Sequence, residues 1–174
     1  MTEQYTQTVE VKTSNADKAK LLAGIALLML SLVFVILGIM KNRLYLIGFG
    51  VLFVLGMVLV QIFESSPSEF IYGISAKSLV IAKKNNAHNT KRIACIDLEK
   101  VVRIERFLDI VSKNDVIACE NPSNLGVFAI VFLDCVKEDD EIKQIKKRAL
   151  LSPDDYMLAL FAENFQDKFV GDEN

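Results

Sequence analysis

The chain has little of the chemistry that catalytic sites require. Its single histidine, His88, lies in a polar stretch with no cysteine nearby, and Asp97 is nine residues away. A histidine that acts as a base or metal ligand needs partners within bonding distance, so we interpret His88 as a solvated turn residue. There is no glycine-rich phosphate loop, no G-x-S-x-G elbow and no H-E-x-x-H motif. We therefore expect no enzyme activity and no cofactor.

Cysteine is scarce as well. Cys95, Cys119 and Cys135 are an odd number, with no close pair and no C-x-x-C spacing. This pattern excludes a disulfide framework and argues against a zinc site, so we expect buried thiols in a reducing compartment. The acidic run KEDDE, which begins at Lys137, lacks the glycine and the alternating ligands of a calcium loop. We interpret it as a solvated turn and predict no metal site.

Charge is nearly absent from residues 21–63, where Lys41 and Arg43 are the only charged side chains. They divide this segment into two uncharged runs of twenty residues, 21–40 and 44–63. At 1.5 Å per residue each run forms a helix about 30 Å long, which matches the hydrocarbon core of a bilayer. A buried hairpin in a soluble protein would keep a polar face, and a cleaved signal peptide would have a shorter apolar run. We predict a transmembrane helical hairpin.

Three residues, Lys41, Asn42 and Arg43, separate the two runs. They are too few to cross a membrane, so both ends of the hairpin must lie on the same side. We expect four side chains to anchor the helix ends at the membrane interface: Lys20, Lys41, Arg43 and Tyr45. The side of the termini carries five flanking lysines, namely Lys12, Lys18, Lys20, Lys77 and Lys83. The tip carries only two cations. Because flanking cations favour the cytoplasm, we predict a cell-membrane protein with two spans and cytoplasmic termini.

Beyond the hairpin the chain is dense in charge. From Glu64 onward there are 15 Lys and Arg against 19 Asp and Glu, a net of −4, which excludes a general nucleic-acid binder because such domains are basic. The stretch 64–68 contains Pro67 and is interpreted as a linker. From residue 69 apolar residues alternate as in strands, and 126–136 is expected at the centre of the sheet. The expected strands are 69–75, 79–84, 91–98, 101–107, 115–120, 126–136 and 142–151.

After Leu151 the apolar period becomes helical. Ser152 as N-cap, Pro153 at the first helical position and two aspartates in the first turn are typical of a helix start. The apolar stripe of this helix is Leu158, Phe161, Ala162 and Phe165. We predict an α+β membrane protein in which an antiparallel sheet of about six or seven strands over 69–168 is closed by a C-terminal α-helix. The polar segment 1–20 fits either a short strand or a helix, and 169–174 is a polar tail.

The segment YGISAKSLVIAKKNNAHNTKRIACIDLEKVVRI, residues 72–104, resembles the opening of bacterial pleckstrin-homology-like (PH-like) domains. In those domains an aromatic residue, a small hydroxyl residue and a turn precede an apolar strand, a hairpin and an apolar–x–Leu–x–x–apolar step, here Ile96 to Val101. The whole chain is similar to small uncharacterised bacterial membrane proteins in which a two-helix transmembrane hairpin precedes such a domain. The resemblance implies a PH-like barrel closed by a helix. It implies no enzyme activity and no catalytic residues.

Two basic groups remain. The first flanks the polar turn NNAHN and comprises Lys83, Lys84, Lys91 and Arg92; the second precedes Leu151 and comprises Lys143, Lys146, Lys147 and Arg148. The resemblance implies that the first group can contact anionic lipid headgroups, where each cation adds about 1 kcal/mol. A solvated polar face is the alternative for both groups.

Two classes of function follow from these features. One is a membrane-anchored, non-enzymatic binding or scaffold module that presents its domain to a protein partner or to the lipid bilayer. The other is an accessory or regulatory subunit of a larger transport or envelope complex, docked through the hairpin. A seam of small residues would favour docking. The first run offers Gly24, Ser31 and Gly38, and the second run offers the glycines Gly48, Gly50 and Gly56.

Overall fold

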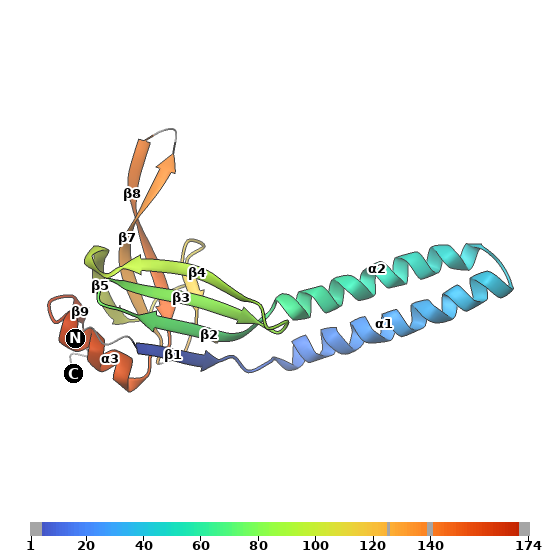
Figure 1. Cartoon of the computed structure of the whole chain (residues 1–174), viewed down its shortest axis with the longest axis horizontal. Coiled ribbons are helices and arrows are strands. Elements are labelled where there is room, and N and C mark those ends of the chain that lie inside the picture. Colours follow the sequence, from blue (N-terminus) through green and yellow to red (C-terminus); the bar gives the residue numbers. More distant parts are fainter. Residues whose placement is uncertain (1–4, 125, 139–140, 171–174) are drawn as a thin grey trace. The chain divides into compact units, whose positions relative to one another are not determined.

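The structure is a computed structural model that describes residues 5–124, 126–138 and 141–170. It is an α+β chain in which two long apolar helices near the N-terminus are followed by sheets whose strands are mostly antiparallel (Figure 1). The chain forms two compact units. The helical unit comprises residues 12–68 together with 85–89, and the β unit comprises the described residues through Val11, 69–84 and those from Thr90 onward.

The helical unit contains α1 (Asn15–Met40) and α2 (Leu44–Ser65), which lie side by side as an antiparallel pair (Figure 1). Both helices are long and apolar enough to cross a membrane, and only 17% and 6% of their most apolar windows are buried. Helix α1 begins six residues before the predicted start at Leu21. Its N-cap is Ser14, whose side chain accepts a hydrogen bond from Ala16 N, and Asp17 adds a favourable charge in the first turn.

Small residues allow the two helices to approach closely. Gly24, Ser31 and Gly38, spaced seven residues apart, are the buried residues of α1, and Gly56 is the buried residue of α2. A Cβ atom built on Gly56 would lie 3.0 Å from the carbonyl oxygen of Gly24, so a larger side chain there forces the backbones apart. By contrast, a Cβ on Gly50 meets nothing within 4 Å. The small-residue seam is therefore used for packing inside the hairpin.

Four strands form the first sheet in the order β1 (Tyr5–Glu10), β2 (Pro67–Ile74), β3 (Ser78–Asn85) and β4 (Thr90–Asp97). Of the two alternatives for the N-terminal segment, the strand is therefore the one observed over Tyr5–Glu10. Strand β1 pairs antiparallel with β2, from Tyr5 opposite Ile74 to Glu10 opposite Glu69, so the whole helical hairpin is inserted between two neighbouring strands. The predicted linker 64–68 is not an irregular segment, because α2 continues to Ser65 and β2 begins at Pro67.

The second sheet contains five strands, and a short 3₁₀ helix, η1 (Leu98–Lys100), leads into it from β4. Their order is β6-β8-β7-β5-β9, which confirms the central place of β7. The bounds are β5 Val101–Arg106, β6 Val116–Ala118, β7 Phe128–Glu138, β8 Glu141–Leu151 and β9 Phe169–Val170. Seven strands, β2–β8, correspond to the expected ones, so the predicted number of six or seven is confirmed, but they do not form one antiparallel sheet. In the described residues these strands, together with β1 and β9, are divided between two sheets, and both β6–β8 and β5–β9 pair in parallel.

Several details of the second sheet differ from the sequence prediction. Residues 169–170 were assigned to a polar tail but form β9, because α3 and the turn after it return the chain to Ile104 of β5. In the described residues the two sheets do not close into one barrel. Strands β7 and β8 run across the direction of β2–β4 (Figure 1), an arrangement typical of orthogonally packed sheets. The tip of the predicted KEDDE turn, 139–140, lies outside the described residues.

The core lies between these sheets and α3 (Asp155–Asn164), which contributes the buried side chains of Met157 and Phe161. Tyr72 of β2 is fully buried at its centre. Its hydroxyl donates to the carbonyl oxygen of Ala118 and accepts from Ser152 N, and burial raises the pKa of the phenol. Other large, fully buried side chains include Leu79, Ile81, Ile96, Ile104, Ile130, Leu150 and Leu151.

The predicted N-cap of this last helix, Ser152, is wrong. Asp154 is the N-cap, and its carboxylate accepts a 2.8 Å hydrogen bond from Met157 N. The backbone N–H of Asp154 donates to the side chain of Gln7 in β1, which holds residue 154 in an extended conformation outside the helix. The buried stripe shifts accordingly, since Met157 rather than Leu158 joins Phe161 in the core.

Candidate functional site

The antiparallel hairpin of β3 and β4 brings the four predicted lipid-contacting residues together, but it does not make them equivalent. Lys83 lies directly opposite Lys91, Lys84 opposite Thr90, and Arg92 opposite Ala82. Lys84 forms a 2.8 Å ion pair with Glu69 of β2, and both side chains are 27% exposed. Lys84 is therefore largely neutralised within the sheet, whereas Lys83 and Lys91 form a cross-strand pair of like charges.

Two like charges directly opposite each other destabilise a sheet by roughly 0.2–1 kcal/mol. Lys91 and Arg92 are exposed and Lys83 is half-buried, so an anion can reach the pair from solvent. A phosphate group placed between the two ammonium groups would remove the repulsion and form charge-assisted hydrogen bonds. The site defined by Lys83 and Lys91, which we call the basic pair, is thus suited to an anionic ligand. Arg92, the next residue of β4, lies opposite Ala82 and faces the other side of the sheet.

The turn between these strands, residues 85–89, is built by its own side chains and backbone. Asn85 Oδ1 accepts from Asn89 N at 2.8 Å, and Asn85 N donates to Asn89 O at 3.1 Å. His88 has φ of 62°, a left-handed conformation that residues other than glycine adopt infrequently. Its side chain is exposed, which confirms the prediction of a solvated turn residue.

Sequence reasoning missed the contact that this turn makes with the end of α2. Asn86 Nδ2 donates to Phe63 O at 2.9 Å, Asn86 N donates to Ser66 O at 3.1 Å, and Ala87 N donates to Glu64 O at 3.4 Å. A signal for it exists in the sequence. The second run ends at Phe63 with no glycine to cap the helix, and Pro67 prevents the helix from continuing.

The four predicted membrane anchors lie at the two ends of the helical hairpin. Lys20 forms a 2.8 Å ion pair with Asp17 in the first turns of α1. Lys41 and Arg43 lie in the loop at the tip and are exposed, and the ring of Tyr45 packs edge-on against Phe34 of α1 at 6.0 Å. The side chain of Asn42 accepts a hydrogen bond from Leu44 N, the first residue of α2.

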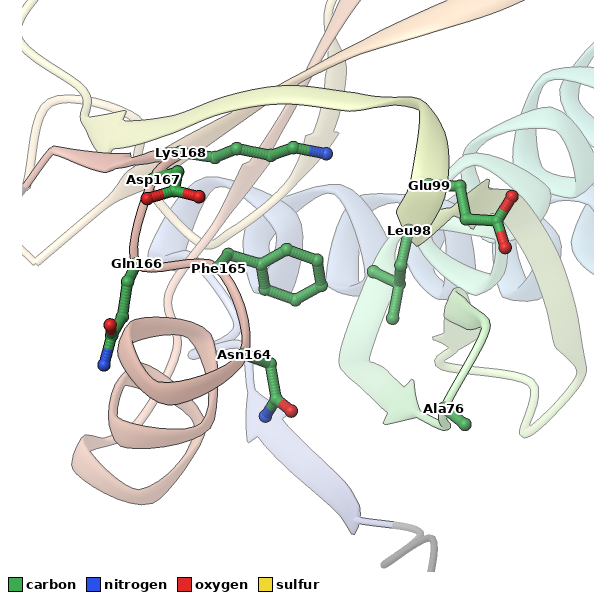
Figure 2. A pocket seen from close by; sticks show the side chains of 8 residues that line it. All are labelled: Ala76, Leu98, Glu99, Asn164, Phe165, Gln166, Asp167 and Lys168. Carbon is green, nitrogen blue, oxygen red and sulfur yellow. The ribbon is translucent and has the colours of Figure 1, made fainter.

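The β unit also contains a small hollow of about 360 Å³, at the lower end of the range for small-molecule sites (Figure 2). Leu98 of η1 and Phe165, which follows α3, point toward one another across it, and the side chain of Lys168 extends above them (Figure 2). Ala76, Glu99, Asn164, Gln166 and Asp167 complete the lining. This lining contains no histidine, cysteine or hydroxyl side chain, and its ionisable groups are those of Glu99, Asp167 and Lys168.

Two members of the second basic group, Lys147 and Arg148, form ion pairs. Lys147 pairs with Asp134 at 2.7 Å, and Arg148 bonds to Asp109 and Asp115, whose side chain is 4% exposed. Arg148 also lies over the ring of Phe107 and donates to Ile110 O. It thereby organises the loop after β5. That loop carries Leu108 and Ile110, which are 80% and 84% exposed.

The cysteines are free thiols, but they are not all buried as predicted. Cys119 is buried, and burial raises its pKa to about 11, so the thiol is unreactive at neutral pH. Cys95 and Cys135 are exposed. Because strands alternate, one residue in two on an outer strand such as β4 faces away from the core. Within the described ranges no group of three or more His, Cys, Asp or Glu side chains is placed to hold a metal ion.

The chain was compared with protein-family models, with curated proteins and with solved structures, and none of these matches it. The chain can therefore be classified only by its architecture. It is a chain with two helices of membrane-spanning length, inserted between the first two strands of a two-sheet β unit.

Proposed function

We propose that this chain is a membrane-anchored, non-enzymatic binding or scaffold module that presents a PH-like β unit at the cytoplasmic face of the cell membrane. The observation that carries the proposal is the contact of the 85–89 turn with the end of α2. This turn lies between Lys83 and Lys91 in the chain, so the basic pair is only a few residues along the sequence from a turn that is bonded to the end of α2.

The strand order supports the PH-like assignment in part. A run of mostly antiparallel strands followed by one C-terminal helix that packs on the core is what the resemblance implies, and α3 packs on the core in this way. The departures are the added strand β1, the parallel edge strands and the absence of barrel closure in the described part of the chain.

Two features support a hairpin with both termini on one side. The tip between α1 and α2 is too short to cross a bilayer. The chain also leaves β1 at Glu10 and enters the neighbouring strand β2 where Glu69 lies opposite Glu10, so both ends of the hairpin connect to the same sheet. Cytoplasmic termini rest on the five-to-two excess of lysines at this end. A reporter that is active only outside the cytoplasm, fused after Asn174, should stay silent; an active reporter contradicts the orientation.

The ligand of the basic pair is proposed to be the anionic headgroup of membrane lipid. The test uses the β unit released from the membrane by replacing residues 11–68 with Asn-Gly. It should co-sediment with vesicles that contain phosphatidylglycerol and not with neutral phosphatidylcholine vesicles. At about 1 kcal/mol per cation, the double substitution K83A/K91A should weaken binding about 30-fold. The matched control K84A should change it little, because Lys84 is paired with Glu69.

Two results contradict the lipid proposal. One is equal binding to neutral and anionic vesicles, and the other is an unchanged affinity in K83A/K91A. Binding should also fade at high salt, because the Debye length falls from about 8 Å at physiological ionic strength to about 3 Å at 1 M. If the pair proves inert toward lipid, a protein partner becomes the better candidate for the same anionic chemistry.

The accessory-subunit alternative has less support. Its main indication was a small-residue seam for docking to another membrane protein, and that seam is occupied by the contact between α1 and α2. Of the helical glycines, Gly50 faces open space and is the position from which such docking could still proceed. Co-purification of a stoichiometric membrane partner that Gly50→Leu releases would favour this alternative.

A further inference from the structure

The C-terminal end of α2 stops abruptly and leaves carbonyl groups without helical partners. Ser66 has φ of −65° and ψ of 144°, an extended conformation imposed because it precedes Pro67. The chain therefore cannot form the left-handed cap that commonly ends a helix. The hydroxyl groups of Ser65 and Ser66 both donate to Ile62 O, at 2.9 and 3.0 Å, which covers one carbonyl.

The next two helical carbonyls receive donors from the 85–89 turn, which is remote in sequence. Asn86 Nδ2 donates to Phe63 O, which also accepts from Ser66 N at 3.1 Å, and Ala87 N donates to Glu64 O, while Asn86 N donates to Ser66 O. Phe63 is the last residue of the apolar run and Glu64 is the first charge after it. The turn thus caps α2 at the point where a membrane-spanning helix would leave the hydrocarbon core.

The turn keeps its shape independently of this contact. The Asn85–Asn89 hydrogen bonds and the left-handed backbone of His88 lie within the turn itself. Release from α2 would therefore break the three bonds made by Asn86 and Ala87 without unfolding the turn. The structure shows the bonded position, and an element that keeps its own shape on release would meet the physical requirement for a switch.

We propose that the 85–89 turn is a latch on the C-terminal end of α2, closed by Asn86, whose opening depends on the thickness of the surrounding membrane. This inference rests on the proposed function, because it assumes that α2 spans a bilayer. When the hydrocarbon layer is thick, the carbonyls of Phe63 and Glu64 are shielded from water and the latch stays closed. When the layer is thin, water reaches these carbonyls, competes with Asn86 and opens the latch.

The test is residue-resolved amide exchange, measured by NMR on the full chain in micelles. Asn86→Ala should speed exchange of the amides of residues 86 and 87 about fivefold, which corresponds to the loss of one hydrogen bond. The amides of Asn85 and Asn89, which bond within the turn, should be unchanged. Asn86→Asp should act in the same direction, because it replaces the donor with an acceptor facing Phe63 O. Asn89→Ala is the matched control in the same turn, since Asn89 contributes its backbone.

Coupling to the membrane is tested with detergents of different chain length. In the unsubstituted chain, exchange at Asn86 and Ala87 should slow as the alkyl chain lengthens from about 10 to about 14 carbons. In Asn86→Ala this dependence should vanish. The latch is refuted if the two amides exchange at the same rate with and without Asn86, if all four turn amides accelerate together, or if chain length has no effect.

These results are separable from the proposed function. Vesicle binding by the released β unit depends on Lys83 and Lys91 and does not involve α2. If K83A/K91A abolishes lipid binding while the exchange rates ignore Asn86, the latch fails and the proposed function stands. If the exchange pattern follows Asn86 and chain length while vesicles are not bound, the latch stands and lipid is the wrong ligand for the basic pair.

Discussion

The start of α3 provides a sharp test of the structure, because two neighbouring residues compete for the same role. Asp154 accepts from Met157 N at 2.8 Å, whereas Ser152 lies two residues upstream, before Pro153. Replacing an N-cap aspartate by alanine costs about 0.5–2 kcal/mol. We expect Asp154→Ala to lower the free energy of unfolding by about 1–2 kcal/mol, and Ser152→Ala to change it by less than about 0.5 kcal/mol.

Asp154 also accepts a hydrogen bond from the hydroxyl of Tyr5, so its loss weakens the attachment of β1 as well. Asp154→Ser separates the two effects, because serine restores the cap but is too short to hold the same bond to Tyr5. Its stability should therefore fall between those of the native protein and Asp154→Ala. Tyr5→Phe should then cost less in the Asp154→Ala background than in the native one.

The assay is urea unfolding of the full chain in micelles, followed by tyrosine fluorescence. The chain has no tryptophan, and the micelle keeps the helical hairpin folded, so the transition reports on the β unit. Equal midpoints for Asp154→Ala and Ser152→Ala would refute the cap assignment. A larger loss in Ser152→Ala would restore the interpretation made from the sequence alone.

Three further predictions follow from features of the two units. Replacing residues 11–68 with Asn-Gly should give a soluble β-rich monomer by gel filtration and circular dichroism, whereas the chain that begins at Glu69 should fail to fold because it lacks β1. Gly56→Leu should separate α1 from α2 and expose their seam to hydrogen exchange, while Gly50→Leu should not, because a Cβ there meets no neighbour within 4 Å. Stability should fall above pH 10, because burial raises the pKa of Tyr72 above its ordinary value of 10.0 and ionisation then favours the unfolded chain. Below pH 10 this contribution is fully present, and urea midpoints from about pH 8 to about pH 11 should show a smaller decline in Tyr72→Phe.

The sequence predicted correctly those helices and strands that are marked by a pattern within their own residues. The uncharged runs predicted both helices, the three polar residues at 41–43 predicted the tip, and alternation predicted most strands from residue 69 onward. The apolar length of 126–136 correctly indicated the centre of a sheet, where β7 pairs with β8 on one edge and β5 on the other.

The features that the sequence did not predict have a common cause: each depends on a contact with a residue far away in the chain. The mostly polar strand YTQTVE is recognisable only through its pairing with β2 across the inserted hairpin. Asp154 replaces Ser152 as N-cap because Gln7 binds its backbone. For the candidate site, the sequence placed the four basic residues around one turn. It showed neither the neutralisation of Lys84 by Glu69 nor the bonds from Asn86 to the end of α2.

The insertion of the helices between β1 and β2 has a consequence for how the protein is made. Strand β1 leaves the ribosome first, but its partner follows only after residues 11–66, which include both apolar helices. At about 5–20 residues per second, β1 waits several seconds with its edge unpaired. Its composition suits this wait, since Gln7, Thr6 and Thr8 keep the nascent strand soluble. The sheet is completed only once the helical hairpin has been synthesised, so formation of the β1–β2 pair requires that both helices have already been made.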